Sequence, residues 1–211
     1  MNMEHENLMT QETARQFEEL QELGDCYVSV GQYAQAQTCY EKTALLSPDE
    51  PGPYVGLGVV ALQKNLLDDA EIAFRVASRL DSDCSQAYAG LGMIAQKRGA
   101  FETAFDMYLK CLDRDTDNLT ALLGLFQSSC QMGTFAKVIY YLEVFLEMHP
   151  DDESVLFSLA AIYMKESRFW QSKRTLETLL GLNADNKDAV DLLEEVERGL
   201  LIQQGAIREK V

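Results

Sequence analysis

The sequence is poor in several residue types, and each shortage argues against a class of protein. It carries 18 Lys and Arg against 34 Asp and Glu, which gives an acidic chain with a formal net charge of −16. Binding to nucleic acid or to an anionic membrane surface depends on basic side chains, so this balance argues against both. Only four of the 211 residues are proline, so helices can form almost everywhere.

Cysteine and long apolar runs are also scarce. The five cysteines are scattered and include no C-x-x-C pair, a pattern that indicates reduced thiols and no disulfide framework. The longest apolar run, residues 54–62, is under half of the roughly 20 residues that a membrane-spanning helix needs. The acidic start of the chain is unlike a secretory signal. Together these features predict a cytoplasmic protein with no direct membrane insertion.

Motifs that carry catalysis are absent from the sequence. It contains no G-x-S-x-G, P-loop or H-E-x-x-H pattern, and its acidic residues form no paired-carboxylate arrangement. The only histidines, His5 and His149, are not accompanied by the cluster of His, Cys, Asp and Glu that a metal site requires. We therefore expect no enzyme activity, no metal and no cofactor.

One spacing recurs along the chain without insertion or deletion. Glycines stand at Gly24, Gly58 and Gly92, each 34 residues after the last. Twelve residues after each glycine, or its equivalent in later registers, stands a mostly small residue, and four residues further on a large apolar one: Ala36 and Tyr40, Ala70 and Phe74, Ala104 and Tyr108, Val138 and Leu142, and Ser172 and Leu176. Five registers in succession predict a repeat protein.

This pattern resembles the tetratricopeptide repeat (TPR), whose signature W-x₂-L-G-x₂-Y, A-x₃-F and P spans about 34 residues. The sequence departs from the signature in the fourth and fifth repeats, at Phe126 and Ser172. The resemblance implies an all-α fold, a right-handed superhelical solenoid of antiparallel helix pairs. It divides the chain into a polar, partly helical extension at 1–16, five repeats at 17–50, 51–84, 85–118, 119–152 and 153–186, and a capping helix with a tail at 187–211.

The turn between the two helices of each repeat falls at one position. Gly31, Gly99 and Gly133 occupy it in three repeats, where glycine reaches positive φ without steric cost. Asn65 tolerates the same conformation. Ser167 suits it less well, so we expect the fifth turn to be looser.

The two ends of the chain differ in character. Residues 1–9 are polar and predicted to be unstructured, with helix beginning near Thr10 or Glu12. Residues 187 to about 202 have apolar side chains at helical spacing and are predicted to cover the last repeat. Three consecutive apolar residues exceed what a cap requires and suggest a homo-oligomer contact: Leu200, Leu201 and Ile202.

The resemblance implies a concave groove, lined mainly by the first helix of each repeat, that holds a protein or peptide. The first repeat has seven acidic residues and one basic residue, so this groove begins at an acidic mouth. It continues to a weakly basic floor around Lys97 and Lys165. The residues that the resemblance places on the groove are Gln21, Asp25, Val55, Gly56, Val59, Leu62, Gln86, Gly90, Met93, Lys97, Leu123, Gly124, Gln127, Gln131, Phe157, Ala161 and Met164.

Three of these positions are glycine where many members of the family carry asparagine: Gly56, Gly90 and Gly124. Glycine leaves room for another backbone, which favours an amphipathic helix or apolar peptide as partner. Alternatively, the glycines only repeat a duplicated ancestral unit. On the first interpretation, Gly90→Arg would abolish partner binding and leave folding intact.

The positions that match the basic clamp of the chaperone-binding members carry no basic residue here: Gln21, Asp25, Gly56, Gln86 and Gly90. A partner with an acidic C-terminus is therefore not expected. The leading hypothesis is a protein-binding adaptor or scaffold. The alternatives are a secretion or assembly chaperone for a hydrophobic client, and a self-assembling TPR scaffold. Trp170 is either packed under the capping helix or exposed on the convex face as an anchor.

Overall fold

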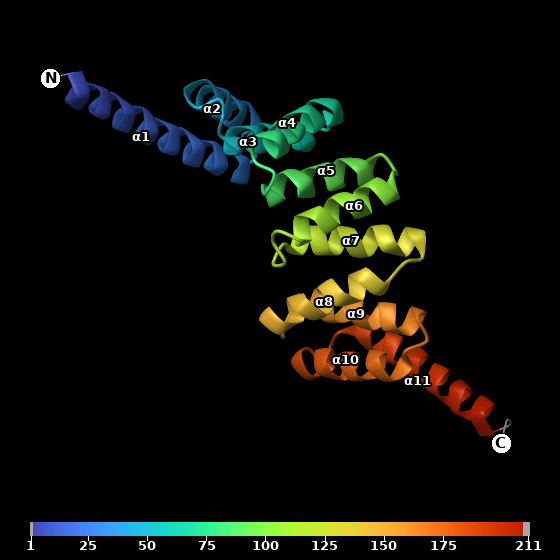
Figure 1. Ribbon diagram of the computed structural model, residues 1–211. Helices are drawn as coiled ribbons and strands as arrows, with labels where there is room; N and C mark the ends of the chain where they lie inside the picture. Colours follow the sequence, from blue (N-terminus) through green and yellow to red (C-terminus); the bar gives the residue numbers. More distant parts are fainter. Residues whose placement is uncertain (1, 209–211) are drawn as a thin grey trace. The chain divides into compact units, whose positions relative to one another are not determined.

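The computed structural model describes residues 2–208, and this part of the chain is helical, with no strand. Its helices fall into two compact units, Met1–Asp115 and Thr116–Val211, which we call the N-terminal unit and the C-terminal unit. Figure 1 shows the helices of each unit following one another as hairpins. The fold is therefore an α solenoid of helix pairs.

The N-terminal unit contains three such pairs. Within a pair, the two helices pack along each other because the turn between them is short. The second helix of one pair then packs on the first helix of the next, as α2 does on α3 and α4 on α5. The six helices are α1 (Asn2–Ser29), α2 (Tyr33–Leu46), α3 (Pro51–Gln63), α4 (Leu67–Leu80), α5 (Ser85–Lys97) and α6 (Phe101–Leu112).

The C-terminal unit continues with two pairs and a final helix. The helix α9 pairs with α10, and α11 packs against α10 and, more lightly, α9. Asn118 and Asp152 cap α7 and α9, because their side-chain oxygens accept the backbone N–H of Ala121 and Val155, both at 3.0 Å. The five helices are α7 (Leu119–Met132), α8 (Ala136–Met148), α9 (Glu153–Lys165), α10 (Phe169–Leu182) and α11 (Lys187–Arg208).

The period of the sequence recurs in the helix boundaries. Four first helices begin 34 residues apart, α3 at Pro51, α5 at Ser85, α7 at Leu119 and α9 at Glu153. Proline is tolerated at the first position of α3 because the backbone N–H it lacks has no helical partner there. The helix starts thus follow the spacing of the repeated residues.

The predicted turn residues all have a left-handed backbone. Gly31, Gly99 and Gly133 have φ of 73°, 75° and 70°. Asn65 and Ser167 adopt the same region, with φ of 58° and 59°, and these two are the positive-φ residues other than glycine in the described part of the chain. The left-handed conformation predicted for the glycines and Asn65 is confirmed. The expectation of a looser fifth turn is wrong, because Ser167 has the same backbone conformation and the N–H of Arg168 still bonds the oxygen of Tyr163 at 2.8 Å.

The repeated small and large residues form the core. The five residues at the repeated small position are fully buried: Ala36, Ala70, Ala104, Val138 and Ser172. The rings of Tyr40, Phe74 and Tyr108, at the repeated large position, are 1% exposed. A β-carbon added to Gly24 would lie 2.6 Å from the Tyr40 ring. Glycine is therefore required for the first helix to approach the ring of the second.

Ser172 replaces the usual alanine of the fifth repeat without leaving an unpaired polar group. Its hydroxyl donates a hydrogen bond of 2.7 Å to the backbone oxygen of Ala160 on the neighbouring helix. A buried hydroxyl costs free energy only when it lacks a partner. The departure from the repeat signature is thus accommodated locally.

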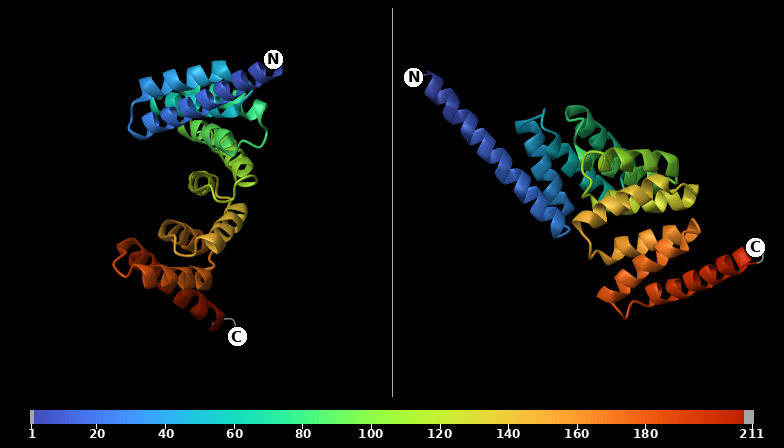
Figure 2. Two further views of the ribbon diagram at one scale, coloured as in Figure 1. Left: turned by 90° about the vertical axis from the view of Figure 1, so that its left-hand side faces the viewer. Right: turned by 60° about the horizontal axis from the view of Figure 1, so that its bottom comes forward.

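At the N-terminus, the prediction of an unstructured segment is wrong for residues 2–9, and residue 1 lies outside the described part of the chain. The helix α1 already begins at Asn2, and its N-terminal part runs past α2 (Figures 1 and 2). Residues 2–23 contain neither glycine nor proline, so nothing in the sequence ends the helix. On the exposed surface of α1, an ion pair of 2.8 Å joins Arg15 to Glu19 one turn later.

At the C-terminus, α11 packs on the last hairpin. Ala189 and Val196 are fully buried, and Gly199 lies against the ring of Phe169. The suggestion that Leu200 forms a contact between copies is wrong, because its side chain is 7% exposed and belongs to this core cluster. Leu201 and Ile202 are on the other side of the helix, 70% and 73% exposed.

Candidate functional site

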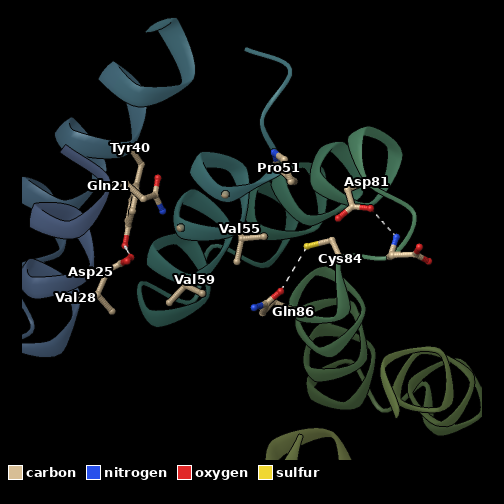
Figure 3. Close-up of a pocket in the computed structure, with 13 residues that line it drawn as sticks. Gln21, Asp25, Val28, Tyr40, Pro51, Val55, Val59, Asp81, Cys84 and Gln86 are labelled. Carbon is tan, nitrogen blue, oxygen red and sulfur yellow. Dashed lines mark hydrogen bonds between the residues drawn. The ribbon is translucent and has the colours of Figure 1, made fainter. Parts of the chain in front are cut away.

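A groove of about 470 Å³ opens in the N-terminal unit. Figure 3 shows α1 on one side, α3 as the floor, and the α4–α5 loop with the start of α5 on the other side. This volume is within the range of small-ligand pockets, about 300–1,000 Å³. The groove is lined by Gln21, Asp25, Val28, Tyr40, Pro51, Gly52, Val55, Gly56, Val59, Asp81, Asp83, Cys84 and Gln86.

Six residues predicted to face a groove line this one: Gln21, Asp25, Val55, Gly56, Val59 and Gln86. Val55 and Val59 are half-buried and pack against the core cluster around Phe74. They place apolar surface on the floor, between α1 and the α4–α5 loop. The centre of the groove is therefore apolar.

The other predicted residues of the N-terminal unit do not line this groove, and two of them are buried. Leu62 is 7% exposed and belongs to the same core cluster. Gly90 is buried, and a β-carbon there would lie 2.4 Å from the Phe74 ring. Met93 is half-buried against that cluster, whereas Lys97 is exposed. The proposed binding roles of Leu62 and Gly90 are therefore wrong.

The remaining predicted residues lie on α7 and α9 of the C-terminal unit. Gly124 is buried, which contradicts its predicted place on an open surface. The others range from exposed, at the two glutamines, to half-buried, and Phe157 and Met164 pack against the core cluster that includes Leu176. The full set is Leu123, Gly124, Gln127, Gln131, Phe157, Ala161 and Met164.

Sequence reasoning missed two carboxylates of the groove. Asp81 and Asp83 stand in the loop between α4 and α5 and line the groove. Asp81 lies on the side opposite Asp25 (Figure 3). The prediction considered mainly the first helix of each repeat, whereas these residues end the second repeat. The sequence did carry a signal, because two acidic residues, Asp81 and Asp83, fall between Leu80 and Gln86.

Hydrogen bonds hold the acidic residues in place. The hydroxyl of Tyr40 donates to Asp25 Oδ1 at 2.6 Å, and the backbone N–H of Asp83 donates to Asp81 Oδ1 at 2.8 Å. Burial, and then the bond to the Asp25 carboxylate, raises the pKa of Tyr40, so its hydroxyl stays a donor at neutral pH. Arg114 lies 3.5 Å from Asp83. No basic residue is among the residues that line the groove.

Two polar groups of the lining are removed from solvent. The Oε1 atom of Gln21 is buried and has no hydrogen-bond partner. The thiol of Cys84 lies 3.7 Å from Gln86 Oε1, and burial raises its pKa. The thiol is therefore neutral at physiological pH and suits packing, not nucleophilic chemistry.

Aromatic side chains are exposed in the C-terminal unit. Trp170, at the start of α10, is 65% exposed, so it is not packed beneath the final helix. On α8, the rings of Tyr140 and Tyr141 meet edge to face with centroids 5.2 Å apart.

His149 follows the last residue of α8, and its imidazole contacts the carboxylate of Asp117.

The comparisons with known proteins identify the repeat. Family models described as tetratricopeptide repeat match residues 22–83 and 85–118. The chain belongs to the tetratricopeptide-repeat family. Its fold is thus that of a protein–protein interaction module, and no enzyme family is indicated. No curated protein sequence matches the chain.

Solved TPR structures share the fold at low sequence identity. PilF of Pseudomonas aeruginosa has a TM-score of 0.74 and 18% identity, over 93% of this chain and 90% of its own. YrrB, described as a TPR protein with an unusual peptide-binding site, has a TM-score of 0.64 and 16% identity, over 82% and 89%. The first TPR domain of Spaghetti (RPAP3), bound to the HSP90 peptide SRMEEVD, has 0.53 and 22%, over 57% and 95%.

The described residues also bear on two other kinds of site. Among them, no three His, Cys, Asp or Glu side chains are grouped so that they could hold a metal ion. None of the described helices combines the length and apolar character needed to cross a bilayer. The groove of the N-terminal unit is the candidate site because six of the residues predicted to bind a partner line it.

Proposed function

We propose that the chain is a non-catalytic adaptor that holds an apolar helix or peptide of a protein partner in the groove of its N-terminal unit. The observation that carries this proposal is the half-buried floor of Val55 and Val59 in an open groove of about 470 Å³. Fully burying an exposed side chain of this size contributes about 1.5–3 kcal/mol, and a partner gains the part that corresponds to the still exposed surface of each valine. YrrB and the RPAP3 domain support it, since both are described with peptides.

The test uses leucine-rich peptides selected from a displayed library against the whole chain. We expect Val59→Gln to weaken their binding about tenfold or more, which corresponds to about 1.4 kcal/mol. The matched control is Ile72→Gln, which makes a similar change on α4 at a side chain that is 64% exposed and outside the groove. Isothermal calorimetry and thermal melting are measured for both variants.

Each outcome of this experiment has one meaning. Weaker binding by Val59→Gln alone, with unchanged melting, supports the groove. Weaker binding by Ile72→Gln alone moves the binding face to the outer helices and overturns the proposal. A role as chaperone of a hydrophobic client requires in addition that co-expression with the chain keeps that client from aggregating.

Self-association is a second candidate function, because Leu201 and Ile202 are exposed side by side on α11. Light scattering over a concentration series tests it. A mass that rises with concentration in the native chain and stays constant in the Leu201→Gln, Ile202→Gln double variant supports it. A constant mass for the native chain rules this contact out.

We also propose a cytoplasmic location. All five cysteines are free, and Cys39, Cys84 and Cys111 are buried, which suits a reducing compartment. Fractionation of cells that express the full chain tests this, and recovery with secreted or envelope proteins would contradict it.

A further inference from the structure

The groove of the N-terminal unit has an apolar floor between two acidic sides. Val55 and Val59 form the floor, Asp25 projects from α1 on one side, and Asp81 stands on the α4–α5 loop on the other (Figure 3). An occupant that covers the valines therefore comes near carboxylates in both directions along the groove.

Most of the negative charge of these carboxylates is not balanced by a basic side chain. Asp83 has Arg114 at 3.5 Å, but Asp25 and Asp81 are bonded only to a tyrosine hydroxyl and a backbone N–H. No Lys, Arg or His lines the groove, and on α1 Glu18 and Glu22 add to the negative charge on either side of Gln21. The local field therefore favours a cation and opposes an anion.

A third observation concerns hydrogen bonding. The Oε1 atom of Gln21, on the same wall as Asp25, is buried without a donor. A buried acceptor left unpaired costs free energy that a donor from an occupant would recover. An occupant that carries N–H donors can pair with it once the carboxamide turns towards the groove, and basic side chains carry only donors.

We infer that the partner segment carries an apolar side chain flanked on both sides by Lys or Arg. This inference rests on the proposed function, since it specifies the chemistry of the segment held in that groove. The apolar side chain lies on Val55 and Val59, and the flanking cations lie near Asp25 and Asp81. The groove thus selects the opposite charge to the SRMEEVD peptide that the RPAP3 domain holds.

The experiment compares three synthetic peptides with the same pair of leucines at the centre, flanked on both sides by lysine, serine or glutamate. Each ion pair of partly exposed groups is weak by itself, but the lysine peptide forms two of them at once. We expect the full chain to bind the lysine peptide about tenfold more tightly than the serine peptide at low ionic strength. The glutamate peptide is expected to bind most weakly. The preference for lysine should shrink as salt shortens the Debye length to about 8 Å.

The decisive variant is Asp25→Asn, Asp81→Asn. Asparagine keeps a side-chain oxygen that accepts from Tyr40 and from the Asp83 N–H, so the fold retains both bonds. We expect this variant to bind the lysine and serine peptides equally. The control, Glu102→Gln with Asp106→Asn, removes the same charge from the exposed surface of α6 and should keep the preference.

The results separate this inference from the proposed function. If lysine and serine peptides bind equally to the native chain, and Val59→Gln weakens both, the groove binds apolar segments and the charge inference is wrong. A lysine preference that survives Asp25→Asn, Asp81→Asn also overturns it. If none of the three peptides binds, both the inference and the proposed function fail.

Discussion

The ring of Phe74 lies 2.4 Å from the position that a β-carbon on Gly90 would occupy. The Tyr40 ring stands in the same relation to Gly56, at 2.5 Å. These glycines therefore make room for an aromatic side chain of the preceding repeat, and not for the backbone of a partner. The prediction that Gly90→Arg separates binding from folding is wrong for this reason.

Replacing a helical glycine that lies against an aromatic ring, and one that does not, tests this explanation. We expect Gly90→Ala to lower the free energy of unfolding by about 1–3 kcal/mol, because the added methyl group overpacks the core. Gly181→Ala, on the exposed surface of α10 with no atom within 4 Å, should raise it by about 0.4–1 kcal/mol. Urea unfolding of the two variants measures both changes. Equal effects would show that the contact with Phe74 is unimportant.

The fifth turn offers a stabilising substitution. Ser167 has φ of 59°, a conformation that costs a residue with a β-carbon about 1–2 kcal/mol. We expect Ser167→Gly to raise the free energy of unfolding of the C-terminal unit by about 0.5–1 kcal/mol, part of the relief being offset by the freer unfolded chain. Ser167→Ala is the control and should change stability little. A loss of stability in Ser167→Gly would contradict the strain at this turn.

Buried tyrosines predict a loss of stability at high pH. Burial, and then the hydrogen bond to Glu143, raises the pKa of Tyr163 to about 12. The folded state therefore keeps its proton in a range where the unfolded state, with a pKa of about 10, loses it. The contribution is fully present below pH of about 10 and is lost as pH rises towards about 12.

Urea unfolding between these pH values, for the native chain and for Tyr163→Phe, checks this prediction. The variant should show a shallower fall in stability with pH, since phenylalanine does not titrate. Tyr40, whose pKa is also raised by burial and by Asp25, should keep part of the slope in that variant. Identical slopes would mean that the Tyr163 hydroxyl titrates normally in the folded chain.

The sequence was enough to predict the residues whose position follows from the repeat period. Ala36, Tyr40 and the positive-φ turn at Gly31 recur every 34 residues, because each hairpin must pack on the next in the same way. The groove could be predicted only in part. Asp81 joins it because the α4–α5 loop lies beside α3, and a loop's path is not set by helical periodicity.

Burial of individual residues was the other failure, and it has a physical cause. A residue such as Leu62 or Gly90 can face either the groove or the next hairpin, and the choice depends on a small rotation of the helix about its axis. The rings of the second helices decide that rotation, since they fill the space beside the glycines. Leu200 was assigned to a contact between copies because it is followed by Leu201 and Ile202, whereas its helical spacing from Val196 already placed it in the stripe that covers the last hairpin.

Tyr40 joins two tasks in one side chain. Its ring is wedged between Gly24 of α1 and Gly56 of α3, and its hydroxyl holds the carboxylate of Asp25 at the edge of the groove. A group that binds the Asp25 carboxylate therefore acts on the residue whose partner, Tyr40, packs between α1 and α3. If a segment binds in the groove as proposed, its binding and the attachment of α1 would be linked equilibria, and the bound segment would oppose separation of α1 from the rest of its unit.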